Sequence, residues 1–213
     1  SCSRAELETL APGTPGPDDL LDPAGEPVEL RYPGRCRRGP VRPDAPLAVR
    51  FRVEAFGTVT VADRLQNPLT QSVDAIVGDF VLKRRDGFYA YQLAVVVDDA
   101  EQGITEVVRG LDLYDNTPRQ RLLQIALGLP VPRYLHLPLI VESGGAKLSK
   151  SRRALPADAG AAPRILTELL GWLRHPVPAM LHGAPVEAQL EWAVGAWNPQ
   201  RLHGVMTIIS TQS

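Results

Sequence analysis

The chain has 213 residues and a formal net charge of −1, with 44% hydrophobic and 22% charged residues, a composition that is ordinary for globular proteins. A net charge this close to zero excludes a protein that binds nucleic acid through its overall charge, so any RNA contact must come from local basic patches. No apolar run approaches the ~18 residues of a membrane helix, and two cysteines are too few for a disulfide framework. We therefore expect a cytoplasmic protein with no membrane partner.

The first part of the chain reads as loops followed by strands. Residues 11–28 are rich in Pro, Gly and Asp and predict a long exposed loop, and residues 31–42 hold five arginines among turn residues. Residues 47–62 alternate approximately around a glycine, which predicts two strands that pair with each other. A further strand is predicted over 78–84, ended by an Arg-Asp-Gly turn.

The middle of the chain alternates strands with a helix. Residues 104–110 and 134–141 predict strands, the second in spite of a proline. The apolar run 91–99 fits either a buried strand or a buried helix by its period alone. Strand–helix–strand order of this kind is typical of a parallel α/β unit.

Three helices complete the prediction. One runs over 117–127, with Asn116 as its N-cap and Pro118 at the first helical position, and it stops at a glycine. Two amphipathic helices follow near 164–174 and 185–197, where apolar side chains predict a buried face. The remaining tail is short and weakly patterned.

The segment 147–151, Lys-Leu-Ser-Lys-Ser, holds two of the only three lysines among the 23 basic residues. Lysine is a compact, long-reaching phosphate donor, and a mobile loop with ammonium groups can close over charge that develops on a departing pyrophosphate. The segment resembles the KMSKS loop of class I aminoacyl-tRNA synthetases. The resemblance implies that Lys150 binds ATP and that Lys147 and Lys150 assist catalysis. The alternative is a solvated basic loop.

A second set of motifs resembles the catalytic domain of the glutamyl- and glutaminyl-tRNA synthetases. This resemblance implies an α/β fold: the second half of a Rossmann-type class I catalytic domain, with a small inserted α+β domain before it and short helices at the C-terminus. It is carried, in order, by residues 79–82, 85–87, 91–99, 108–112, 117–120 and 136–138.

In that family, the residues that match Tyr91 and Arg109 bind the amino-acid substrate. The assignment is chemically sensible, because an arginine fork suits a carboxylate of glutamate and a phenol hydroxyl suits a polar group. Without the resemblance, a core tyrosine and a surface-paired arginine would be favoured. ATP, as the second substrate, brings Mg²⁺.

Three features resemble one branch of this family, which esterifies glutamate to the queuosine base in the anticodon of tRNA(Asp). Only 62 residues follow the basic loop, Leu113 stands where ordinary enzymes carry a histidine, and residues 89–94 match the branch closely. The implied partners are ATP, L-glutamate and the tRNA(Asp) anticodon stem-loop, met by a monomer. The alternatives are an ordinary glutamyl-tRNA synthetase cut from both ends and a non-catalytic RNA-binding paralogue.

The branch often carries a structural zinc site, and Cys2, Tyr32 and Cys36 match its pattern, with the fourth ligand expected upstream of Ser1. Thiolates suit zinc, which takes four ligands in structural sites. The alternative is two buried free thiols.

The resemblance divides the chain into three parts. Residues 1–86 form the inserted connective domain with its zinc-binding segment, 87–146 the second Rossmann half, and 147–213 the basic loop with the C-terminal helices. The HIGH motif of class I synthetases is absent from the chain and is expected upstream. Arginines in 31–42 and Arg152-Arg153 are candidates for RNA phosphate contact, with solvated surface arginines as the alternative.

Overall fold

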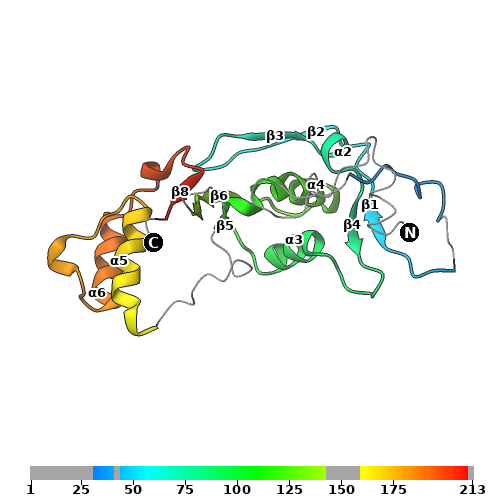
Figure 1. Cartoon of the computed structure of the whole chain (residues 1–213). Coiled ribbons are helices and arrows are strands. Elements are labelled where there is room, and N and C mark those ends of the chain that lie inside the picture. Colours follow the sequence, from blue (N-terminus) through cyan, green and yellow to red (C-terminus); the bar gives the residue numbers. More distant parts are fainter. Residues whose placement is uncertain (1–30, 41–43, 143–158, 211–213) are drawn as a thin grey trace. The chain divides into compact units, whose positions relative to one another are not determined.

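The computed structural model describes residues 31–40, 44–142 and 159–210 (Figure 1). The chain divides into two compact units, whose boundary falls within strands β5 and β6. Unit 1 comprises 1–63, 67–108 and 112–134, and unit 2 comprises 64–66, 109–111 and 135–213. The loop predicted over 11–28 and the basic segment 147–151 lie outside the described residues.

The described residues of unit 1 contain two antiparallel strand pairs. Strand β1 (Val49–Phe51) pairs with β4 (Phe80–Lys83), and β2 (Thr58–Val61) pairs with β3 (Leu69–Ser72). The predicted strands are therefore present, but the prediction that the two strands of 47–62 pair with each other is wrong. A turn that is closed by Phe56 N–H on the carbonyl of Val53 redirects the chain between them.

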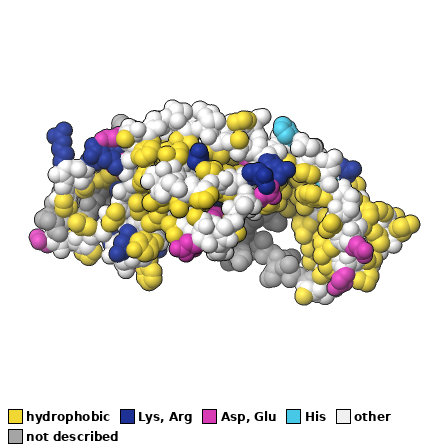
Figure 2. Space-filling view, turned by 180° about the vertical axis from the view of Figure 1, so that it is seen from behind, with side chains coloured by type: hydrophobic (Ala, Val, Ile, Leu, Met, Phe, Trp, Pro, Cys, Tyr) yellow, Lys and Arg dark blue, Asp and Glu magenta, His cyan; other side chains and the backbone are white. Residues whose placement is uncertain are grey.

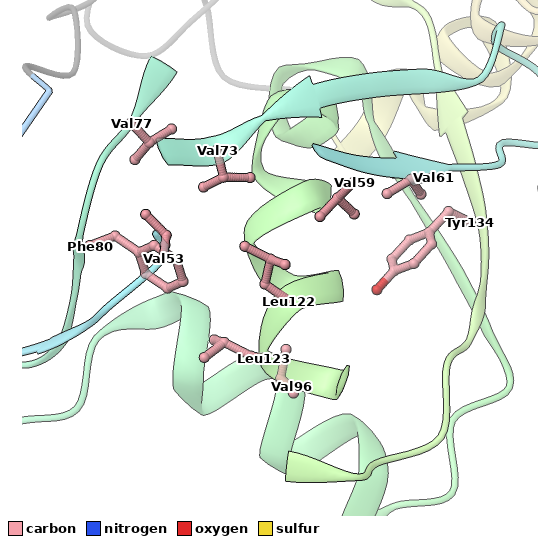
Figure 3. Packing of buried hydrophobic residues seen from close by; sticks show 10 residues of the cluster. All are labelled: Val53, Val59, Val61, Val73, Val77, Phe80, Val96, Leu122, Leu123 and Tyr134. Atoms are coloured by element: carbon pink, nitrogen blue, oxygen red, sulfur yellow. The ribbon is translucent and has the colours of Figure 1, made fainter. Parts of the chain in front are cut away.

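The helices of unit 1 pack on these strands around one apolar core. They are α2 (Val73–Ile76), α3 (Tyr91–Glu101) and α4 (Thr117–Leu127). Figure 3 shows Leu122 and Leu123 of α4 among side chains from the strands and from α3. The ambiguous run 91–99 is helical, which buries Val96 and leaves Asp98 exposed.

The helix predicted over 117–127 has the predicted bounds, and Gly128 ends it in the left-handed conformation at φ 65°. The N-cap prediction is wrong in its mechanism. Residues 111–116 already form a 3₁₀ helix, so Asn116 has helical dihedrals and does not cap α4 with its side chain. Its Oδ1 instead accepts a hydrogen bond from Nε2 of Gln92.

Around α4 the strand–helix–strand order is confirmed. Strands β5 (Glu106–Gly110) and β6 (Arg133–Leu137) are neighbours in a two-stranded sheet, and α4 connects them. The stretch predicted as one strand over 134–141 is broken at Pro138, because proline cannot donate to a strand ladder. Its second part, β7 (Leu139–Val141), pairs in parallel with β8 (Thr207–Ile209), a strand in the tail that the sequence did not predict.

Unit 2 includes the helices α5 (Ala162–Trp172) and α6 (Val186–Ala196), which are close to their predicted bounds. Leu170, Val177 and Ala193 form a small core, whereas Leu190 is 46% exposed and lies outside it. Short 3₁₀ helices cover Ala159–Ala161, Ala179–Leu181 and Pro199–Leu202.

The surface fits the near-neutral composition. On the face drawn in Figure 2, Lys and Arg side chains gather in separate small groups, and hydrophobic side chains occupy much of the area between them. Among the residues that the structure describes, no helix is long and apolar enough to span a membrane.

Candidate active site

Arg109 lies at the end of β5 and is paired with a histidine from β6. Its Nε donates a hydrogen bond to Nε2 of His136 at 2.9 Å. His136 is fully buried, and Arg109 is half-buried. The sequence motifs include His136 but predict no role for it. The signal lies in the strand alternation, because His136 stands two residues after the buried Tyr134 and so belongs to the inward-facing side of β6.

Gln66 fixes the backbone beside this pair. Its Nε2 donates to the carbonyl of His136 and to the carbonyl of Val205, both at 3.0 Å. Gln66 is itself 5% exposed, so this is a buried polar group with both amide hydrogens engaged. The histidine is thereby held by its strand and by a side chain from a distant part of the sequence.

Tyr91 is the first residue of α3, and its side chain is 50% exposed. The start of α3 is fixed by the preceding strand, since the N–H of Ala90 donates to the carbonyl of Leu82 at 2.8 Å. Tyr91 belongs to unit 1 and Arg109 to unit 2. The glutamate-binding role of these two residues stays a prediction. Lys147 and Lys150 lie outside the described residues.

The Thr-Pro-Arg-Gln motif at 117–120 is structural in large part, because all four residues are buried. Gln120 donates through Nε2 to Oε1 of Gln92 at 3.0 Å, and Gln92 in turn donates to Asn116. These amides join α3 to the start of α4. The motif that helps to reveal the family therefore fixes the helix that follows β5.

The segment predicted to bind zinc brings Tyr32 and Cys36 together, because the backbone N–H of Cys36 donates to the Tyr32 hydroxyl at 2.8 Å. They line a cavity of about 250 Å³, together with Arg37, Arg50, Arg52 and Asp79. The Arg50 guanidinium lies 4.1 Å from the centre of the Tyr32 ring.

The predicted zinc site needs two ligands beyond Tyr32 and Cys36. Zinc takes four ligands in structural sites, and of the predicted ones the described residues include Tyr32 and Cys36. Within 31–40, 44–142 and 159–210, no group of three or more His, Cys, Asp or Glu side chains could hold a metal ion. Cys2 lies outside these residues. The zinc site therefore stays a prediction.

The arginine-rich segment 31–42 serves the fold in part. Arg37 makes ion pairs with Glu54, Asp74 and Asp79, and Arg31 donates to the carbonyl of Asp74 at 2.7 Å. Arg37 is therefore not a free phosphate contact.

Asp79 is buried at the centre of these interactions. Its burial disfavours the charged carboxylate, but hydrogen bonds from Arg37 and from the backbone N–H of Val53, with the charges of Arg37 and Arg50, outweigh this effect. Together they lower the pKa of Asp79 below its ordinary value.

Comparison with known proteins identifies the family of the chain. The sequence matches the family described as tRNA synthetases class I (E and Q), catalytic domain, over residues 32–161. The chain belongs to this family. The matched range contains β1 to β7, α2 to α4, Tyr91, Arg109 and His136, so the candidate site lies within a class I catalytic domain.

Two curated relatives show which members of the class I family the chain is similar to. The Glutamyl-Q tRNA(Asp) synthetase of Pseudomonas aeruginosa is 51% identical over 180 residues, which cover 83% of this chain and 60% of that protein. The Glutamyl-Q tRNA(Asp) synthetase of a Synechococcus species is 46% identical over 173 residues, which cover 81% of this chain and 58% of that protein. The chain thus spans about three fifths of the length of these relatives.

Solved structures confirm the predicted fold class. The glutamate-tRNA synthetase of Elizabethkingia anophelis matches 99% of this chain and 47% of its own, with a TM-score of 0.65 and 20% sequence identity. A glutamate tRNA ligase of Elizabethkingia meningosepticum gives a TM-score of 0.63, also at 20% identity. At this identity the likeness concerns the fold alone, which is the α/β fold of the class I catalytic domain.

Proposed function

We propose that the protein activates glutamate with ATP and transfers it to the queuosine base in the anticodon of tRNA(Asp). The observation that carries this proposal is the 51% identity to a Glutamyl-Q tRNA(Asp) synthetase over 83% of the chain. Membership of the E and Q family fits glutamate or glutamine as the amino acid, and the guanidinium of Arg109, which suits a carboxylate, favours glutamate. A structural zinc ion stays a prediction and takes no part in the two steps below.

In the first step, a glutamate carboxylate oxygen attacks the α-phosphorus of ATP, and the bond from that phosphorus to the pyrophosphate oxygen breaks. The products are glutamyl-adenylate and pyrophosphate. Arg109 binds a carboxylate of the substrate, and the Tyr91 hydroxyl binds a polar group. Lys147 and Lys150 stabilise the negative charge that develops on the leaving pyrophosphate. ATP enters with Mg²⁺.

In the second step, a hydroxyl of the queuosine ring attacks the acyl carbon of the adenylate. AMP leaves, the hydroxyl loses its proton, and a glutamyl ester forms. No covalent intermediate with the protein is required, so the protein acts by positioning the reactants and by stabilising charge.

The experiment uses an anticodon stem-loop of tRNA(Asp), prepared with and without queuosine and given to the full-length protein with labelled glutamate and ATP. Such a stem-loop has no acceptor end, so any label must reside on the loop. We expect label on the queuosine-containing stem-loop alone. Labelling of intact tRNA(Glu) instead would identify an ordinary glutamyl-tRNA synthetase, and labelling of neither RNA would indicate a non-catalytic RNA-binding protein.

A further inference from the structure

The pairing of Arg109 with His136 carries a consequence for how the substrate is held. A guanidinium Nε always bears a hydrogen and can only donate, so the Nε2 that it contacts at 2.9 Å must present a lone pair. His136 is therefore neutral in this arrangement, with its proton on Nδ1. An imidazolium would place a donor against a donor and a positive charge against a positive charge.

The two partners differ in freedom. His136 is fully buried on β6, and Gln66 also holds its backbone carbonyl, so the imidazole is a fixed reference point. Arg109 is half-buried, and an arginine side chain has several rotatable bonds whose immobilisation costs free energy on binding. A hydrogen bond at Nε fixes the plane of the guanidinium before any substrate arrives.

The bond at Nε also selects between two ways of meeting a carboxylate. An arginine can bind a carboxylate side-on, through Nε and one terminal nitrogen, or end-on, through its two terminal nitrogens. Because Nε of Arg109 already donates to His136, the side-on geometry would require that bond to break. An intact bond between Arg109 and His136 therefore favours the end-on geometry.

We propose that His136 is a positioning residue for substrate binding, which holds Arg109 in the orientation that receives a carboxylate of glutamate end-on. This inference rests on the proposed function, since it assigns glutamate to Arg109. His136 does not touch the substrate. It acts through Arg109, because Nε2 of its neutral imidazole accepts the hydrogen bond from Nε.

The test compares two variants of the full-length protein in glutamate-dependent exchange of pyrophosphate into ATP. His136→Leu keeps a similar apolar volume and removes the acceptor, whereas His136→Gln keeps an acceptor oxygen at the reach of Nε2. We expect His136→Leu to raise the KM for glutamate about 10- to 100-fold, the scale of one hydrogen bond to a charged group, with the KM for ATP unchanged. His136→Gln should recover most of the loss.

A structural role would give a different result, because a distorted site would raise both KM values and both variants would suffer alike. That outcome, or a wild-type KM for glutamate in His136→Leu, would overturn the inference. If His136→Leu does not fold, ¹⁵N spectra of the wild-type imidazole decide instead. Nε2 should resonate as an unprotonated nitrogen, and a protonated Nε2 would overturn the inference. Absence of exchange in the wild-type protein would instead count against the proposed function itself.

Discussion

Arg37 holds the carboxylate of Asp79 through two parallel hydrogen bonds. Its Nε donates to Oδ2 at 2.7 Å, and its Nη2 donates to Oδ1 at 2.8 Å. Oδ1 of Asp79 also accepts a hydrogen bond from the backbone N–H of Val53 at 3.1 Å. A bidentate pair of this kind, with a carboxylate that is only 4% exposed, links the segment before β1 to the start of β4.

Replacement of Arg37 by methionine should lower the free energy of unfolding by about 3 kcal/mol. This value is the low end of the range for breaking a buried ion pair, because the Arg37 side chain is 24% exposed while its partner Asp79 would be left buried and charged. Urea denaturation of both proteins measures the difference. Arg38→Met provides the matched control, since Arg38 is exposed and should tolerate the change within about 0.5 kcal/mol. Equal losses in the two variants would contradict the structural role of Arg37.

Acid should remove the contribution of Asp79. The folded protein lowers the pKa of this carboxyl below its ordinary value of 3.8, so the charged form stabilises the fold at pH values above 3.8. As the pH falls below 3.8 and through the lowered pKa, the carboxyl becomes protonated in both states and its contribution disappears. The difference in unfolding free energy between the wild type and Asp79→Asn should therefore be constant near neutral pH and shrink below pH 4. A difference that grows on acidification would contradict the stabilising effect of the charged Asp79 carboxylate.

Gly78 should not tolerate a side chain. It has φ of +71°, and a Cβ at this position would lie 2.4 Å from the backbone carbonyl oxygen of Tyr32. Gly57 has a similar φ of +62°, but a Cβ at Gly57 would have no neighbouring atom within 4 Å. Gly57→Ala should cost about 1 kcal/mol for the left-handed backbone alone, and Gly78→Ala should cost clearly more, because backbone atoms must move apart. Thermal or urea unfolding of both variants measures the two costs, and equal values would remove the proposed contact with Tyr32.

The sequence predicts helices and strands better than it predicts which strands pair with each other. The helix over 117–127 was found because its period, its proline and its terminal glycine all depend on near neighbours in the chain. The partners of β1 and β2 were not found, since they are set by contacts such as that of Asp79 with Val53, which join residues 26 positions apart. Strand β8 has no signal of its own and exists through its pairing with β7.

The same limit applies to the candidate site. Arg109 was found through a motif, and its partner His136 lies 27 residues further along the chain, beyond the reach of any spacing rule. The ion pairs of Arg37 could not be predicted from the sequence, for a related reason. A run of arginines predicts a basic surface, and only the fold reveals that three carboxylates from separate segments surround one of them.

The chain holds only three lysines, and they differ in expected role. Lys150→Ala should slow the formation of glutamyl-adenylate by about 10²–10³-fold, the scale of one lost donor to charge that develops in a transition state. Rapid-quench measurement of adenylate in the full-length protein reports this step directly. Lys83→Ala is the matched control, since Lys83 lies on β4 with its Nζ 5.6 Å from the centre of the Tyr89 ring and has no proposed contact with ATP. Adenylate formation at the wild-type rate in Lys150→Ala, or an equal loss in Lys83→Ala, would remove Lys150 from the proposed mechanism. A selective loss in Lys150→Ala would support the assignment of segment 147–151 to the pyrophosphate, because both variants remove the same charge and only one of them removes it from the predicted loop.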